Sequence, residues 1–317
     1  MVQLILKRLL IMISKFMALT VITFFFGYAV LRIRMNNFYD FFFHQPPINY
    51  WDWITNGLFR GDFGYTMIRG WASSPTTVVE VISRGLGNTV SLLLLTLIIV
   101  YGIGIPLGII SSRYENKFLG RFVKGFSALG ASVPAFVLSL LLLRQLAFRN
   151  QWFPWRGSLP IGMERESVTF LTYFLARIHH LIIPSASMAF VLLIVPIGYL
   201  TSGISNVKKE TYVTTARAKG NDERRLLKKH ILKNATTPLI SSAPLQISAV
   251  ISGAIIIEEL FSIPGVASLF WQAFIWTEIE LMKGIILLFG AILLVASFIS
   301  EIIIIMKNPI LIDKYIK

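Results

Sequence analysis

Six long stretches of the chain are almost purely apolar, and the segments between them carry nearly all of the charge. A helix that crosses the hydrocarbon core of a bilayer needs about 20 apolar residues, and six windows reach or approach that length. The windows are residues 16–31, 88–112, 125–143, 181–207, 235–257 and 284–306. The pattern therefore predicts an all-α integral membrane protein with six transmembrane helices.

Composition agrees with this interpretation. Of the 317 residues, 55% are hydrophobic and only 15% are charged, whereas soluble domains contain roughly 45–50% apolar and about 25% charged residues. The sequence holds no cysteine, which excludes a disulfide framework, a thiolate nucleophile and a thiolate metal site.

The formal net charge of +14 is distributed unevenly over the segments between the windows. If the N-terminus is cytoplasmic, 19 of the 30 Lys and Arg residues fall in cytoplasmic segments, as the positive-inside rule requires. We therefore expect both termini in the cytoplasm and a multi-pass protein of the lipid bilayer. The charge then reflects topology, and no nucleic-acid partner is expected.

The windows divide the chain into two parts. Residues 1–87 contain the first transmembrane helix and an aromatic extracytoplasmic loop, 32–87, which forms either an interfacial belt or a lid over a pathway. Residues 88–317 contain the core of five transmembrane helices. Within this core, residues 169–177 are expected to form a short surface helix.

The cytoplasmic loop 205–237 is highly charged but is patterned like two helices. Residues 210–219 favour a helix, and Gly220 is suited to end it in the left-handed conformation. Asn221 or Asp222 can cap a second helix over residues 223–234. Small and apolar residues among the charges indicate that this loop packs against its own helix ends or against a partner.

This loop resembles the coupling motif of binding-protein-dependent ABC importers, in the dipeptide, oligopeptide and nickel branch. The residues that carry the resemblance are Glu210, Tyr212, Thr215, Ala216, Arg217, Ala218, Lys219, Gly220, His230, Asn234 and Pro238. The resemblance implies that they bind and couple to an ATPase.

Two further motifs on the extracytoplasmic side are similar to motifs of the same family. They consist of Gly61, Asp62, Phe63 and Gly64, and of Glu258, Phe261, Pro264 and Gly265. The resemblance implies a role in an extracytoplasmic gate or in docking. Asn88-Thr89 also resembles the start of the second transmembrane helix in this family.

The resemblance implies a type I ABC importer permease fold in a bacterial cytoplasmic membrane. The chain would form half of a translocation pathway for peptides, or for nickel or a metallophore. Its partners would be a second homologous permease subunit, two ATPase subunits and an extracytoplasmic substrate-binding (lipo)protein. The chain has no Gly-x-x-x-x-Gly-Lys-Ser/Thr phosphate loop, so ATP-Mg would bind to the partner ATPases. No catalytic, cofactor or metal site is expected in the chain itself.

Prolines within the windows suit helix bending or close packing. They are Pro106, Pro134 and Pro196. Candidates for lining a peptide pathway are Asn88, Ser132, Ser139, Ser185 and Ser187.

Two other classes of protein stay open on the residues alone. A secondary transporter or channel would usually carry charged residues near the middle of the membrane, and none lies clearly there. A membrane-embedded enzyme would need a metal or catalytic site, for which His179 and His180 are the best candidates, but no His-Glu-x-x-His pattern is present.

Overall fold

The computed structural model describes residues 2–34, 50–67 and 74–307, and this part of the chain is mostly helical. The α-helices are α1 (Val2–Arg34), α3 (Tyr50–Arg60), α4 (Val78–Arg113), α5 (Phe118–Ser132), α6 (Ala135–Leu142), α7 (Phe170–Leu192), α8 (Ile194–Val207), α9 (Thr211–Ala218), α10 (Glu223–Leu226), α11 (Leu232–Ala235), α12 (Thr237–Leu260), α13 (Val266–Trp276) and α14 (Ile279–Lys307). Shorter elements are the π-helical turns η1 (Leu143–Arg149) and η3 (Leu227–Ile231), the 3-10 turn η2 (Arg165–Ser167), and strands β1 (Tyr65–Thr66) and β2 (Thr76–Thr77). The two strands pair antiparallel, with Tyr65 opposite Thr77.

Five helices of the described chain are long and apolar enough to cross a membrane, which confirms the all-α membrane fold. They are α1, α4, the continuous pair α7–α8, α12 and α14. The window 125–143 is not one continuous helix, because α5 and the α6–η1 helix meet at an angle of 96° beside Pro134, so the sixth span stays a prediction. Proline disfavours the helical conformation in the residue before it, and Val133, next to Pro134, is extended with φ −102° and ψ 125°.

Two helices begin earlier than their apolar windows predict. Helix α4 begins at Val78 rather than at residue 88, and the Thr77 side chain caps it by accepting from the Glu80 amide at 3.3 Å. Residues 170–177, expected within a separate surface helix, are instead the first turns of α7. In both cases a threonine side chain, Thr77 or Thr169, caps the helix ahead of the predicted apolar window.

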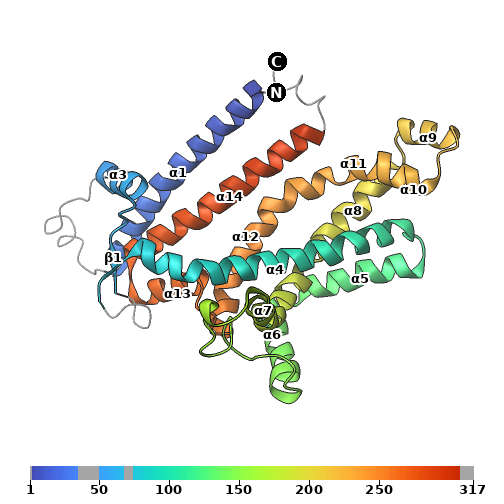
Figure 1. Ribbon diagram of the computed structural model, residues 1–317. Helices are drawn as coiled ribbons and strands as arrows, with labels where there is room; N and C mark the ends of the chain where they lie inside the picture. Colours follow the sequence, from blue (N-terminus) through green and yellow to red (C-terminus); the bar gives the residue numbers. More distant parts are fainter. Residues whose placement is uncertain (1, 35–49, 68–73, 308–317) are drawn as a thin grey trace.

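Helices α1, α12 and α14 run in a similar direction, and many of the connections lie toward two ends of the molecule (Figure 1). The start of α1, the end of α14, the α4–α5 turn and α9–α10 lie toward one end, which we call the α9 end. Helix α3, β1 and α13 lie toward the other, the α13 end. Helix α1 packs along α14, and an ion pair of 3.2 Å joins Arg8 to Glu301 near the α9 end.

Helices α4 and α8 cross at very short range. A Cβ added to Gly104 would lie 2.4 Å from Cγ of Pro196, and one added to Gly108 would lie 2.9 Å from Cβ of Leu200. Glycine therefore lets the two backbones approach closely. Helix α4 continues through Pro106, which lies between these two glycines.

Candidate coupling site and the turn at the opposite end

The connection between α8 and α12 folds as two short helices at an angle, and we call residues 208–236 the elbow. Helix α9 is followed by Gly220 at φ +81°, a conformation that favours glycine. The Asp222 side chain then caps α10 by accepting from the Arg224 amide at 3.2 Å. The expected helix at 223–234 is present, but the π-helical turn η3 interrupts its regular hydrogen bonding.

A small apolar core anchors the elbow to the membrane helices. Val213, which points inward from α9, is fully buried against Leu200 and Ile204 of α8 and against Leu226 and Ile231 of the following turns. Residues that are fully buried in this way fix the position of α9 relative to α8 and α12.

Backbone contact also joins the elbow to α8. A Cβ added to Gly203 of α8 would lie 2.6 Å from the Ala235 carbonyl oxygen of α11. No larger residue fits there unless the helices separate, so α8 and α11 move together.

Polar contacts hold the two arms of the elbow in one arrangement. The Asn234 amide donates to the Tyr212 hydroxyl at 2.8 Å, and the Arg217 guanidinium pairs with Glu223 at 2.7 Å. The Asn221 side chain donates to the carbonyl of Ala216 at 2.8 Å.

The remaining surface of α9 is exposed. Its exposed residues are small, polar or basic: Thr211, Tyr212, Thr214, Thr215, Arg217, Ala218 and Lys219. Glu210 and Pro238 are exposed, and His230 is half-buried. The structure thus brings the predicted coupling residues together on one protrusion with a buried base and an accessible face.

The α4–α5 turn supports α8 beside the elbow. Glu115 accepts a hydrogen bond from Ser205 of α8 at 2.6 Å and pairs with Lys124 of α5 at 3.1 Å. These hydrogen bonds, from Ser205 first and Lys124 second, hold the pKa of Glu115 below its usual value. Glu115 has no sequence signal for this role, because nothing local identifies it as the partner of a serine 90 residues away.

At the opposite end, residues 258–268, which we call the α13 turn, wrap around a buried carboxylate. Glu258 is fully buried and accepts hydrogen bonds from the Thr89 hydroxyl at 2.6 Å and from the Ser268 amide at 2.8 Å. The same Thr89 hydroxyl accepts from the Val266 amide at 2.7 Å. One carboxylate therefore connects α4, α12 and the first turn of α13.

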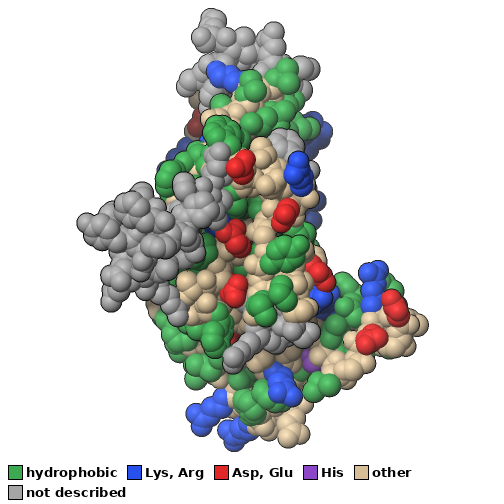
Figure 2. Space-filling model, turned by 90° about the vertical axis from the view of Figure 1, so that its left-hand side faces the viewer, with side chains coloured by type: hydrophobic (Ala, Val, Ile, Leu, Met, Phe, Trp, Pro, Cys, Tyr) green, Lys and Arg blue, Asp and Glu red, His purple; other side chains and the backbone are tan. Residues whose placement is uncertain are grey.

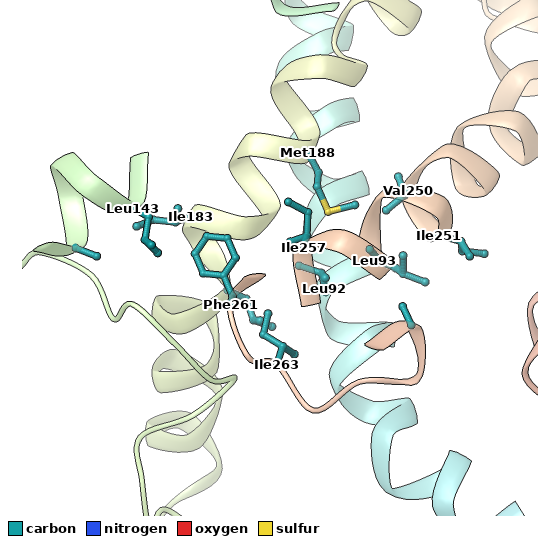
Figure 3. Close-up of a cluster of buried hydrophobic side chains, with 14 residues drawn as sticks. Leu92, Leu93, Leu143, Ile183, Met188, Val250, Ile251, Ile257, Phe261 and Ile263 are labelled. Atoms are coloured by element: carbon teal, nitrogen blue, oxygen red, sulfur yellow. The ribbon is translucent and has the colours of Figure 1, made fainter. Parts of the chain in front are cut away.

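The other motif residues of the α13 turn also have packing roles. Phe261 is buried in the central apolar cluster, where it points toward Ile183 and Leu143 (Figure 3). A Cβ on Gly265 would lie 2.2 Å from a Glu258 carboxylate oxygen, so only glycine fits. The Pro264 carbonyl accepts from the Asn88 side chain at 2.8 Å.

The Gly61–Gly64 motif forms the turn between α3 and β1. Gly61 and Gly64 have φ +68° and +88°, and the Asp62 carboxylate accepts from the Gly64 amide at 3.0 Å. Phe63 packs edge-on against Trp53, with ring centroids 6.4 Å apart. Figure 2 views the molecule from the side where α3, β1 and α13 lie in Figure 1, and it shows several acidic side chains among hydrophobic ones.

Several predicted residues do not line an accessible site. Ser139, Ser185 and Ser187 are fully buried, and Ser139 shares a hydrogen bond with Ser187 at 2.6 Å. None of the three is exposed in this structure, so their role as pathway-lining residues stays a prediction.

The two adjacent histidines also have structural partners. His179 and His180 contact the carbonyls of Trp152 and Arg156 at 2.9 Å and 3.3 Å. Among the described residues no group of three or more His, Cys, Asp or Glu could hold a metal ion.

Comparison with known proteins defines the class of protein. Residues 104–307, well over half of the chain, match the family described as "Binding-protein-dependent transport system inner membrane component". Together with the helical membrane fold, this match defines an inner-membrane subunit of a transport system. The chain belongs to the binding-protein-dependent transport system inner membrane component family.

Individual relatives agree with this assignment. The oligopeptide transport system permease protein AppB of Bacillus subtilis (strain 168) is 29% identical over 262 residues, which cover 83% of this chain and 79% of AppB. The peptide transport system permease protein SapB of Salmonella typhimurium is 25% identical over 319 residues, which cover 96% of each chain.

A solved structure shares the fold. A structure titled "Inward facing conformations of the MetNI methionine ABC transporter" aligns with a TM-score of 0.56 and 13% identity, over 73% of this chain and 97% of that one. At this level of identity the similarity concerns the fold alone.

Proposed function

We propose that this permease carries peptides across a bacterial cytoplasmic membrane and that α9 couples it to ATPase subunits. Peptides are the cargo that the names of AppB and SapB give for those relatives. The functional partners would be a second permease chain, two ATPases and an extracytoplasmic binding protein, in keeping with the family of the chain. ATP-Mg would be bound by the ATPases.

The observation that carries the coupling role is the contrast between the two sides of α9. Val213 is fully buried, whereas Thr211, Thr215 and Ala218 are exposed. A helix with a fixed base and an accessible face can seat in a cleft of another protein and move as a rigid body. Because the elbow connects α8 directly to α12, such a movement tilts both spanning helices.

The α9 end would then face the cytoplasm. The elbow exposes several basic side chains, Arg224, Arg225, Lys228 and Lys229 among them, and Lys and Arg accumulate in cytoplasmic segments. The start of α1 and the end of α14 lie at this same end (Figure 1), so both termini would be cytoplasmic. The α13 end would face the binding protein.

The test is to introduce one negative charge on the exposed face of α9. Ala218→Glu keeps a good helix former in place but puts a carboxylate in the contact. The whole importer is expressed with a tag on this chain, and co-purified ATPase and uptake of a radiolabelled peptide are measured. Both are expected to fall by about tenfold or more, since one buried unpaired charge costs more than 1.4 kcal/mol.

Asn116→Glu is the matched control, because Asn116 is exposed in the α4–α5 turn at the same end of the molecule. It is expected to leave ATPase association unchanged. Full association and uptake in the Ala218→Glu variant would show that α9 is not the coupling helix. If the importer keeps its ATPases but takes up only a cargo that is not a peptide, peptides are not its cargo.

A further inference from the structure

The spanning helices expose two chemically different kinds of surface. In the middle of α4 and along α14 the exposed residues are apolar or glycine: Leu94, Ile98, Gly102, Ile103 and Pro106, and Val295, Ile299, Ile303 and Met306. On α8 and α12 polar residues alternate with apolar ones: Ile194, Gly198, Tyr199, Ser202 and Asn206, and Ser241, Leu245, Ala249, Ser252 and Ile256. Lipid favours the first kind of surface, whereas polar groups mark contact with water, protein or a transported molecule.

A groove of about 510 Å³ runs between α8 and α12 on this mixed surface. Leu192 of α7 lines it together with Ile194, Val195, Gly198, Tyr199 and Ser202 of α8 and with Leu245, Gln246 and Ala249 of α12. Most of the lining is therefore apolar, and Tyr199 and Ser202 are its exposed polar residues. This volume lies within the range of roughly 300–1,000 Å³ found for ligand sites.

Gln246 at this groove has an incomplete set of hydrogen bonds. Its side chain is 2% exposed, and its amide nitrogen donates to the Tyr101 hydroxyl at 2.9 Å and to Ser242 at 3.2 Å. Its amide oxygen is buried and has no hydrogen-bond partner among the described residues. This oxygen has almost no exposed surface, so the polar groups that a molecule in the groove would reach belong to the exposed residues Tyr199 and Ser202.

Gly198 gives the groove its open middle. A Cβ built on Gly198 meets no atom within 4 Å, so nothing in the described chain requires glycine there. The missing side chain instead leaves space for a molecule that lies along α8.

We propose that the α8–α12 groove is a wall of the translocation pathway and binds the main chain of a peptide in transit. This proposal rests on the proposed function and deepens it by naming the surface that the cargo contacts. Main-chain N–H groups of the peptide donate to the hydroxyl oxygens of Tyr199 and Ser202, while apolar side chains contact Leu245. Since every peptide has the same main chain, such a wall accepts many sequences.

A second groove continues this wall between α12 and α14. It has a volume of about 550 Å³, and four serines line it: Ser241, Ser248, Ser297 and Ser300. Leu245 borders both grooves. The polar surface therefore extends across α12, whose first residues follow the elbow, and movement of α9 changes the width of both grooves.

The absence of cysteine from the sequence allows a direct test with single-cysteine variants of the assembled importer. Ala249→Cys places a thiol in the groove, and Ile98→Cys places one on the apolar surface of α4. Inside-out vesicles are treated with the membrane-impermeant reagent methanethiosulfonate ethylsulfonate. A thiol in apolar surroundings has a raised pKa, and one unit lowers its reaction rate about tenfold.

The cysteine at position 249 is therefore expected to react at least about tenfold faster than the cysteine at position 98. Equal, slow reaction of both would overturn the proposal, because the groove would then face lipid or a tightly packed helix.

A matched pair of glycine substitutions tests the role of the groove in transport. Gly198 and Gly102 are both exposed in spanning helices with no atom near an added Cβ, but only Gly198 lines the groove. Gly198→Leu is expected to reduce peptide uptake by about tenfold or more, the equivalent of 1.4 kcal/mol, whereas Gly102→Leu retains uptake. Equal uptake in the two variants would contradict the proposal.

Co-purification of the ATPases is measured in the same membranes. Retained ATPase with normal uptake in the Gly198→Leu variant means that only the assignment of the groove is wrong. If the importer with the unmodified chain shows neither ATPase co-purification nor peptide uptake, the proposed function itself is contradicted. The same holds if both glycine variants lose ATPase and uptake together.

Discussion

The two ends of α12 are held by opposite kinds of interaction. At its first residues the elbow rests on an apolar core around Val213 and exposes its polar groups. At its last residues the α13 turn buries a carboxylate, Glu258, and satisfies it with directional hydrogen bonds. Apolar contacts tolerate small shifts because they are not directional, whereas hydrogen bonds weaken steeply when their angles change.

This difference assigns different tasks to the two ends. The elbow is suited to receive a displacement from a partner and to transmit it as a unit. The α13 turn is suited to keep α4, α12 and α13 in register while the opposite end moves. Three substitutions test this difference between the two ends, and they follow in order of decreasing expected effect.

The largest effect is expected from Glu258→Ala. The change leaves the Thr89 hydroxyl and the Ser268 amide without their acceptor, and each buried donor left unpaired costs about 1–3 kcal/mol, so stability falls by about 2–6 kcal/mol. Thermal unfolding of the detergent-solubilised importer measures the loss, while ATPase co-purification from membranes is retained. Glu259→Ala is the control, because the neighbouring Glu259 is exposed. An equal loss in both variants would show that the buried network has no special contribution.

Val213→Ala should have a smaller effect, confined to the opposite end. Two buried carbon atoms are removed, which costs about 2 kcal/mol when the transfer and cavity contributions are added. Loosening of α9 is expected to lower ATPase association while the α13 turn stays intact. Asn116→Ala, at an exposed position of the α4–α5 turn outside α9, should leave association unchanged. Reduced thermal stability without any change in ATPase binding would contradict the role of this apolar core in coupling.

The smallest effect concerns pH and Glu115. Its pKa is lowered by the hydrogen bonds from Ser205 and Lys124, so the ionised form is stabilised by folding. This contribution is present above the unfolded pKa of about 4.3 and is lost as the pH falls through the lower folded value. Glu115→Gln should therefore lose a small part of its stability near neutral pH and depend less on pH in the acid range. Identical acid unfolding curves for the variant and the original chain would contradict this assignment.

Hydropathy was sufficient to predict most of the fold, because spanning helices need apolar length and little else. The starts of α4 and α7 were missed, although each has a local capping signal, at Thr77 and Thr169. Thr77 and Glu80 have the spacing of a capping box, which marks the true start of α4. Helix α13, with 11 residues, was not predicted because it is too short to register as a span.

Features of the sites were likewise predictable where they depend on the local chain and not where they depend on distant contacts. The turn at Gly220 and the cap at Asp222 were predictable, because each depends on the local chain. The contact of Glu258 with Thr89 was not, since 169 residues separate them and neither has a local feature that identifies the other. The open groove beside Gln246 also depends on how two distant helices pack, so the sequence directed attention to serines that are in fact buried.

The pairing of α1 with α14 has a consequence for how the protein is made. The first helix enters the membrane long before the last one exists, and its ion pair from Arg8 must wait for Glu301. At a synthesis rate of roughly 5–20 residues per second, the delay between these two residues is about 15–60 s. During that time α1 must stay in the membrane without its partner helix. Its long apolar sequence allows this, and only 17% of its most apolar window is buried against the rest of the described chain. Completion of the last helix therefore also completes the packing of the first.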